Sequence, residues 1–191
     1  YNISSTVNDI INMSMAKINE KKVEMIVNCD ATIPSLLLGD EKKIRRVIMN
    51  IVDNAIKFTN EGCVRIQIGY RKEEYGINLI ISVKDSGIGM TEDTLEKVFE
   101  SFTQMDMSRK RNIGGVGLGL AISKTIVHKM GGFLTAQSQL GKGTEVQFVI
   151  PQRVYDETPI ATIENKENLN VAAYIDMEQF EIPAIRDEYA R

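Results

Sequence analysis

The residues best suited to ligand chemistry lie in one stretch, residues 40–59, where polar side chains recur at helical spacing. At 3.6 residues per turn this stretch separates into two faces. The apolar face consists of Ile44, Ile48, Ile51, Val52 and Ala55. The polar face consists of Arg46, Asn50, Asp53, Asn54 and Lys57. Because Asn is a poor helix former, two Asn residues one turn apart are unusual on a solvated helix face.

The two Asn residues and Lys57 define the chemistry that this polar face could support. Amide oxygens are suitable ligands for Mg²⁺, and a lysine ammonium can contact a phosphate group. The face could therefore hold a metal ion and a polyphosphate. The alternative is an ordinary amphipathic surface helix, and this stretch alone does not distinguish the two.

Two glycine-rich segments could approach the same ligand. Asp85 follows a predicted strand, and Gly87 and Gly89 come directly after it. A carboxylate at a strand end can accept from an amine, and the glycines would let the backbone approach a flat ligand. A tight turn is the alternative for this segment.

The second glycine-rich segment, residues 114–120, opens a predicted helix. Backbone amides at a helix N-terminus form an anion site, and a flexible hinge is the alternative. The G-x-G-x-G spacing without a preceding strand does not match a dinucleotide fingerprint. Residues 141–144 do not match a Walker phosphate-binding loop.

Length and composition limit the class of protein. The chain has 191 residues, 43% hydrophobic and 26% charged, which is typical of a globular protein. The net charge of −3 gives no sign of a nucleic-acid partner. Cys29 and Cys63 fit no metal-binding spacing, so we expect reduced thiols. Since the first residue is Tyr1, we expect a segment of a longer protein.

Hydrophobic periodicity predicts an α/β domain over residues 1–151. Helices are predicted at 3–19, 40–59, 92–98 and 116–130. Strands are predicted at 23–29, 63–70, 78–84, 133–139 and 144–151, with a hairpin between the second and third and another between the last two. Residues 30–38 and 101–115 are predicted to be loops. His128, the only histidine, lies near a helix end and is expected to be a surface or capping residue.

The pattern changes after residue 151. Residues 152–169 are polar and aperiodic, which predicts a linker. Residues 170–191 are too short to fold alone, and we expect either the truncated start of a following domain or a segment that docks on the main one.

Taken together, these segments resemble the ATP-binding catalytic domain of sensor histidine kinases, in the superfamily that includes gyrase, Hsp90 and MutL. N-I-V-D-N-A-I-K-F-T is similar to the Asn box, D-S-G-I-G-M to the first glycine box and G-V-G-L-G-L to the second. F-E-S-F-T-Q-M-D with the following Arg111 resembles the Phe box and ATP lid, and G-K-G-T resembles the third glycine segment. Five motifs in the family's order are far more specific than any one of them.

The resemblance implies a Bergerat-type fold, an α/β two-layer sandwich with a mixed sheet covered on one face by helices. It also implies ATP and Mg²⁺ as ligands. Asp85 would bind the adenine amino group, Asn54 would coordinate Mg²⁺ with Asn50 as a second candidate, Lys57 would contact phosphate and Phe58 would lie beside the nucleotide. The other ATP-binding residues implied are Gly87, Gly89, Met90, Arg111, Gly115, Gly117, Leu118, Gly119 and Thr144. Phe99 and Phe102 would anchor the lid, with burial in the core as their alternative role.

Two departures from the family pattern bear on the activity. Val116 stands where the family usually has Thr, which removes a hydroxyl from the lid. Asn50 stands where the ATPase relatives have a Glu that activates water, and an amide cannot act as a general base. We therefore expect transfer of the γ-phosphate to a His on a dimerisation domain outside this chain, and no autophosphorylation of this segment alone. An ATPase-type module and a non-catalytic nucleotide-binding scaffold remain the alternatives.

The resemblance also implies partners and a location. The expected partners are the His-containing dimerisation domain of the parent chain and a response regulator or receiver domain, with the parent a homodimer. Residues 170–176 are similar to the opening of a receiver domain in hybrid kinases, although Met177 follows Asp176 where a second acid is usual. This segment is expected in the cytoplasm, and whether the parent is anchored in a membrane stays open.

Overall fold

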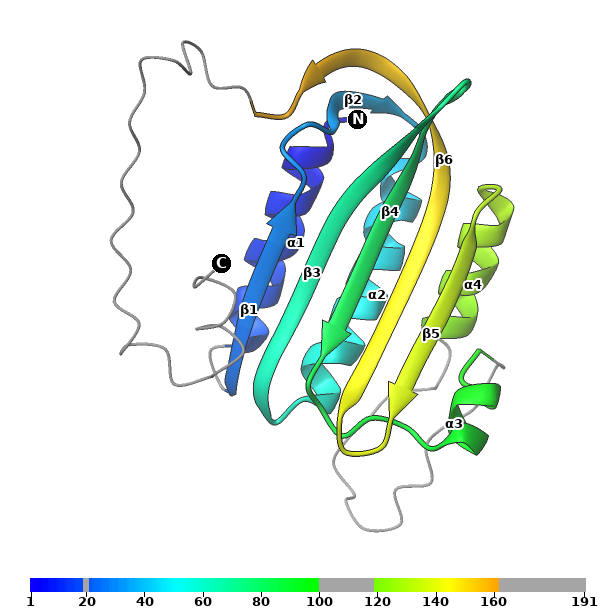
Figure 1. Ribbon diagram of the computed structural model, residues 1–191. Coiled ribbons are helices and arrows are strands. Elements are labelled where there is room, and N and C mark those ends of the chain that lie inside the picture. Colours follow the sequence, from blue (N-terminus) through cyan, green and yellow to red (C-terminus); the bar gives the residue numbers. More distant parts are fainter. Residues whose placement is uncertain (19–20, 100–118, 162–191) are drawn as a thin grey trace.

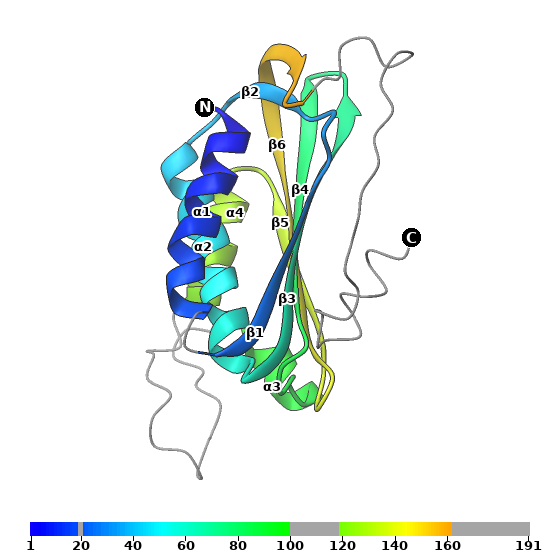
Figure 2. The ribbon, with the colours of Figure 1, turned by 90° about the vertical axis from the view of Figure 1, so that its left-hand side faces the viewer.

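The described residues form a mixed sheet with three long helices on one face. The computed structural model describes residues 1–18, 21–99 and 119–161. In this part of the chain the helices are α1 (Ile3–Ile18), α2 (Glu41–Phe58), α3 (Glu92–Lys97) and α4 (Gly119–Lys129). The strands are β1 (Lys22–Cys29), β2 (Pro34–Leu38), β3 (Glu61–Glu73), β4 (Gly76–Asp85), β5 (Phe133–Gln139) and β6 (Gly143–Pro159). Figure 2 shows α1, α2 and α4 together on one side of the sheet, as predicted for a two-layer sandwich.

The sheet has six strands in the order β1-β3-β4-β6-β2, and β5 also pairs with β6 (Figure 1). Only β1 and β3 are parallel among these pairs, so the sheet is mixed. Its register places Ile68, Ile81, Phe148 and Leu134 in one row across four strands. All four side chains are buried against the helices. Alternate residues along each strand therefore define the face on which the helices pack.

The central helix α2 lies between α1 and α4 (Figure 1). Its buried face includes every residue of the predicted apolar stripe, together with Val47 and Ile56. Burial of each Ile or Val side chain on this face stabilises the fold by about 1.5–3 kcal/mol. The helix begins after Asp40, whose side chain accepts from the Lys43 backbone N–H at 3.1 Å. This packing fixes the rotation of α2 and hence the direction of its polar residues.

Two predictions about the ends of the sheet are wrong. Residues 34–38 are β2 rather than loop, and the predicted linker begins too early because residues 152–159 complete β6. The two segments pair with each other, with Leu37 opposite Val154 and Leu38 opposite Arg153. Register shifts interrupt this pairing, and Pro34 lies within β2, so neither segment has a regular period-2 pattern. Residues 162–191, including the predicted following domain, lie outside the described residues.

The other predicted elements are confirmed within a few residues. The first hairpin is longer than predicted, because β3 and β4 extend to a turn at Glu74 and Tyr75. The predicted loop 101–115 and the start of the helix at 116 lie outside the described residues. None of the helices in the described part of the chain combines the length and the apolar character that a membrane span requires.

Candidate functional site

Asn50 joins α2 to the first turn of α4. Its Nδ2 lies 3.4 Å from the Gly119 carbonyl oxygen and 3.3 Å from Ser123 Oγ. Ser123 Oγ itself donates to the Gly119 carbonyl at 2.9 Å. Because the carbonyl can only accept and the hydroxyl proton is already used, Asn50 must present its NH₂ group to both. The Asn50 carbonyl oxygen is therefore directed away from this cluster.

Asn54 lies one turn further along α2 and also faces the start of α4. A Cβ atom at Gly119 would lie 3.9 Å from Asn54 Nδ2 and 4.0 Å from Asn50 Cγ, so the missing side chain leaves room beside both amides. Asn54 is half-buried. Within residues 1–18, 21–99 and 119–161, its side chain makes no hydrogen bond.

The last turn of α2 carries Lys57 and Phe58, both half-buried. The Lys57 ammonium lies 4.9 Å from the centroid of the Phe58 ring, a cation–π contact. The Phe58 carbonyl accepts from the Ile88 backbone N–H at 3.2 Å. This bond joins the end of α2 to the glycine segment after β4.

Asp85 is the last residue of β4 and is only 8% exposed. It lies two, four and six residues after Val83, Ile81 and Leu79, so its side chain points to the helix-covered face. Its Oδ1 accepts from the backbone N–H of Gly87 at 2.9 Å and of Thr144 at 3.3 Å. Burial raises the pKa of Asp85, while these two hydrogen bonds act in the opposite direction. Both bonds end on Oδ1, which leaves Oδ2 as the oxygen that can accept from a ligand.

The segment after Asp85 is held closely against the β5–β6 hairpin. Gly89 has φ = +64°, and a Cβ atom there would collide with the Gln139 carbonyl oxygen. The Met90 N–H donates to Ser138 Oγ at 2.8 Å, and this hydroxyl is 2.9 Å from Thr144 Oγ1. Met90 is 8% exposed. The glycine segment is therefore a fixed wall of the site.

The predicted site residues separate into two connected groups. One group lies on α2 and consists of Asn50, Asn54, Lys57 and Phe58, of which the two Asn residues adjoin Gly119. The other group lies around the end of β4 and consists of Asp85, Gly87, Gly89, Met90 and Thr144. The Phe58–Ile88 bond connects the groups. The predicted lid and glycine residues Phe102, Arg111, Gly115, Val116, Gly117 and Leu118 lie outside the described residues.

The predicted polar stripe of α2 is wrong in one respect. Asp53 forms an ion pair with Lys17 of α1 at 2.6 Å, whereas Asn50 contacts α4. The two residues therefore lie on opposite flanks of the helix, and the Asp53 side chain is directed towards α1 rather than towards α4. Phe99 packs against the core, with the Lys124 ammonium 4.8 Å from its ring centroid.

Sequence reasoning missed Ser123 and Ser138, two hydroxyls that hold the site. Ser123 is fully buried and bonds both Asn50 and Gly119. Its spacing of four residues from Gly119 places both on one face of α4, which was an available signal. No local pattern indicates Ser138, because its partners come from the segments around Met90 and Thr144.

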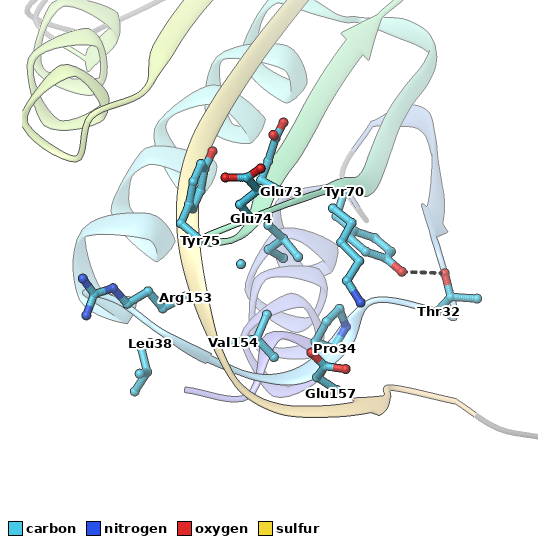
Figure 3. Close-up of a pocket in the computed structure, with 13 residues that line it drawn as sticks. Thr32, Pro34, Leu38, Tyr70, Glu73, Glu74, Tyr75, Arg153, Val154 and Glu157 are labelled. Atoms are coloured by element: carbon cyan, nitrogen blue, oxygen red, sulfur yellow. Dashed lines mark hydrogen bonds between the residues drawn. The ribbon is translucent and has the colours of Figure 1, made fainter.

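A separate pocket of about 410 Å³ lies at the other end of β4 (Figure 3). Tyr70, Tyr75, Arg153 and Val154 are among its lining residues, and Tyr70 OH lies 3.4 Å from Thr32 Oγ1. None of the predicted nucleotide-binding residues lines it. Since β4 begins at Gly76 beside this pocket and ends at Asp85, the pocket is distinct from the candidate site.

The donor set of the candidate site suits a hard cation held together with phosphate. The described part of the chain has no cluster of three or more His, Cys, Asp or Glu side chains that could hold a metal ion alone. The candidate ligands are therefore the amide oxygens of Asn50 and Asn54 on α2. Mg²⁺ accepts such neutral oxygen ligands when phosphate oxygens complete its coordination shell.

These features define a class, an α/β nucleotide-binding domain with a buried acid at a strand end and an Asn-bearing helix. Residues 39–154 match the family model described as "Histidine kinase-, DNA gyrase B-, and HSP90-like ATPase". The chain therefore belongs to this family, and its relatives within it are histidine kinases.

Two curated relatives show the range of this similarity. Hybrid signal transduction histidine kinase B of Dictyostelium discoideum is 34% identical over 152 residues, covering 79% of this chain and 8% of that protein. Sensor protein GacS of Pseudomonas syringae pv. syringae is 33% identical over 173 residues, covering 90% of this chain and 18% of that protein. The chain thus spans less than a fifth of the length of either relative.

Solved structures confirm the fold. Full-length ShkA in complex with AMPPNP superposes with a TM-score of 0.70 at 29% identity, covering 82% of this chain and 31% of that one. The catalytic domain of histidine kinase ThkA superposes with a TM-score of 0.62 at 25% identity, covering 79% of this chain and 93% of that one. The mixed sheet with helices on one face is therefore the fold of histidine kinase catalytic domains.

Proposed function

We propose that this segment binds Mg–ATP and donates its γ-phosphate to a His on a dimerisation domain of the parent chain. The observation that carries the proposal is the buried carboxylate of Asp85, which faces the helix layer and, among the described residues, has hydrogen-bond partners only at Oδ1. The half-buried amide of Asn54 lies across the same site on α2. Asp85 fits the adenine end of ATP, and Asn54 fits its metal-bound phosphate end.

The adenine half is assigned to the end of β4. Asp85 Oδ2 accepts a hydrogen bond from the adenine amino group, while Oδ1 keeps its two backbone donors. Gly87, Gly89 and Met90 form one wall, and Thr144 stays bonded to Asp85. Phe58 lies beside the nucleotide and is fixed to this wall through Ile88.

The phosphate half is assigned to α2 and the start of α4. Asn54 would hold Mg²⁺, with the Asn50 carbonyl oxygen as a second ligand, and Mg²⁺ would neutralise phosphate charge. Lys57 would leave its contact with the Phe58 ring to meet the phosphates. Gly119 leaves space beside both amides. Arg111, Gly115, Gly117 and Leu118 complete the assignment from the family motif.

Phosphoryl transfer fits these residues better than hydrolysis. Asn50 is bonded through its NH₂ to Gly119 and Ser123, and an amide cannot remove a proton from water. In the proposed step an imidazole nitrogen of the acceptor His attacks the γ-phosphorus, the bond to the β–γ bridging oxygen breaks, and ADP leaves. The imidazole proton passes to solvent. His128 is exposed on the last turn of α4, and we do not assign it as the acceptor.

The partners follow from this assignment. The length of the relatives supports a parent protein with further domains, and we propose a homodimeric parent whose phosphoryl group passes to a response regulator or receiver domain. We place this segment in the cytoplasm. No nucleic-acid partner is proposed, since the net charge is −3.

Titration with a fluorescent ATP analogue, with and without Mg²⁺, tests the binding. We expect saturable binding that Mg²⁺ strengthens, and a loss of at least about tenfold in Asn54→Ala, since hydrogen bonds and ligands to charged groups are worth about 1.5–3 kcal/mol. Asp53→Ala is the matched control, because Asp53 neighbours Asn54 but pairs with α1. Equal affinity in Asn54→Ala and Asp53→Ala would contradict the assignment.

A second experiment tests the transfer. The chain alone should acquire no stable label from γ-labelled ATP, and addition of the parent's dimerisation domain should yield acid-labile phosphohistidine on that domain. Stable label on the isolated chain would contradict the expected absence of autophosphorylation. Steady ATP turnover without the acceptor domain would favour the ATPase-type alternative.

A further inference from the structure

Each backbone carbonyl in the last turn of α2, residues 55–58, has a hydrogen-bond partner. The last carbonyl groups of a helix lack partners within the helix and need another donor. The Ala55 carbonyl accepts from Thr59, through its N–H at 3.1 Å and its hydroxyl at 2.8 Å. The Phe58 carbonyl accepts from Ile88 in the glycine segment. The remaining carbonyls of this end point to a single side chain.

That side chain is Lys21, which directly precedes β1. Its ammonium donates to the carbonyl oxygens of Ile56 at 2.5 Å, Lys57 at 3.2 Å and Thr59 at 3.1 Å. An ammonium group has three N–H donors, so these three bonds use it completely. Its positive charge also lies at the negative end of the helix dipole. Lys21 is half-buried, and its partners are backbone atoms rather than acidic side chains.

We propose that Lys21 is a positioning residue for nucleotide binding, holding the last turn of α2 against β1 and the glycine segment. This turn carries Lys57 and Phe58, and the Phe58 carbonyl anchors Ile88. Lys21 is assigned no contact with the nucleotide. It fixes the backbone from which the Lys57 side chain extends. The inference rests on the proposed function, in which Lys57 contacts the phosphates.

The residue next to Lys21 provides a matched control. Lys22 carries the same charge and lies one position along, but its side chain is exposed at the start of β1. Lys22→Met therefore removes a charge without touching α2. Lys21→Met keeps most of the aliphatic stem and removes the three donors together with the charge. Lys21→Arg restores the charge and several N–H donors at the same site.

The first measurement is affinity, obtained by competition of Mg–ATP and of adenosine against a fluorescent ATP analogue. We expect Lys21→Met to weaken Mg–ATP about tenfold, or about 1.4 kcal/mol. Adenosine binding should weaken by less than about threefold. The two hydrogen bonds that hold Asp85 do not involve Lys21, and only the Phe58–Ile88 bond of the adenine wall would loosen. Lys21→Arg should recover most of the affinity, and Lys22→Met should match the wild type. Equal losses for Mg–ATP and adenosine would reduce Lys21 to a purely structural role and overturn the inference.

The second measurement needs no nucleotide. Hydrogen exchange of the Thr59 and Ile88 amides should be at least about tenfold faster in Lys21→Met and unchanged in Lys22→Met, since both amides bond to carbonyls of this turn. Unchanged exchange would overturn the inference even if the affinity fell. Failure of the wild-type chain to bind Mg–ATP would refute the proposed function instead, and the exchange result would still decide whether Lys21 orders the turn.

Discussion

The substitution Asp85→Asn tests the adenine assignment by exchanging one oxygen for an NH₂ group. The amide oxygen can keep the two bonds from the Gly87 and Thr144 backbone N–H groups that Oδ1 accepts. The nitrogen must then occupy the position of Oδ2. Because an adenine amino group is also a donor, two donors would face each other across a site that is only 8% exposed at this residue.

The loss can be estimated from hydrogen-bond energetics. A hydrogen bond to a charged group contributes about 1.5–3 kcal/mol, which corresponds to about a 10- to 150-fold weaker Kd for ATP. Guanine carries a carbonyl oxygen where adenine carries its amino group. The new NH₂ group can donate to that oxygen, so the variant should bind GTP more tightly than the wild type does. The ratio of the two affinities is therefore the sensitive quantity.

The same substitution should weaken ATP binding without lowering the free energy of unfolding. Burial raises the pKa of Asp85, so the folded state favours the protonated form. The stability that the protonated form contributes is present below the ordinary pKa of about 3.9 and is lost as the pH rises through the raised pKa. The amide does not titrate. We expect the variant to be at least as stable as the wild type at pH 7, and to lack this fall.

Competition of ATP and GTP against a fluorescent analogue measures the nucleotide effect, and urea unfolding between pH 4 and 7 measures the stability. Asp156→Asn is the control, since Asp156 lies near the far end of β6. The assignment fails if the Asp85 variant binds ATP within about twofold of the wild type, or if ATP and GTP weaken to the same extent.

Two further substitutions test how the site is held. Gly143→Ala should destabilise the domain by at least about 1 kcal/mol more than Gly141→Ala in urea unfolding, because both glycines have positive φ but only at Gly143 would the Cβ meet the Asp85 backbone carbonyl. Ser123→Ala should cost about 1–3 kcal/mol and weaken Mg–ATP several-fold, because it removes a buried partner of Asn50; unchanged unfolding and titration curves would contradict this.

The sequence predicts the parts of this molecule that depend on local periodicity. Helix α2 has a continuous apolar face, so a 3.6-residue pattern identifies both its extent and its buried side. The period-2 runs of β3 and β4 locate Asp85 at a strand end. The pairing of β2 with the end of β6 could not be predicted in this way, because it joins distant segments whose register is irregular.

The hydrophobic pattern of a helix also does not predict which elements pack on its two flanks. Periodicity separates the buried face of α2 from its polar residues, but it does not say which helix lies on which flank. The pattern therefore groups Asp53 with the Asn residues, whereas in the fold Asp53 pairs with Lys17 of α1. No sequence pattern indicates Lys21 either, since its partners are backbone atoms at the end of another element.

The two Asn residues of α2 have different hydrogen bonds, and we therefore expect them to have different roles. Asn50 uses its NH₂ group on α4, so only its carbonyl oxygen can serve a ligand. Asn54 has no such bond in the described part of the chain and can turn either end of its amide to the ligand. If Asn54 is the main Mg²⁺ ligand, as proposed, Asn54→Ala should reduce the Mg²⁺ dependence of binding without loosening α4. Asn50→Ala should do both, because it also removes the link between the two helices.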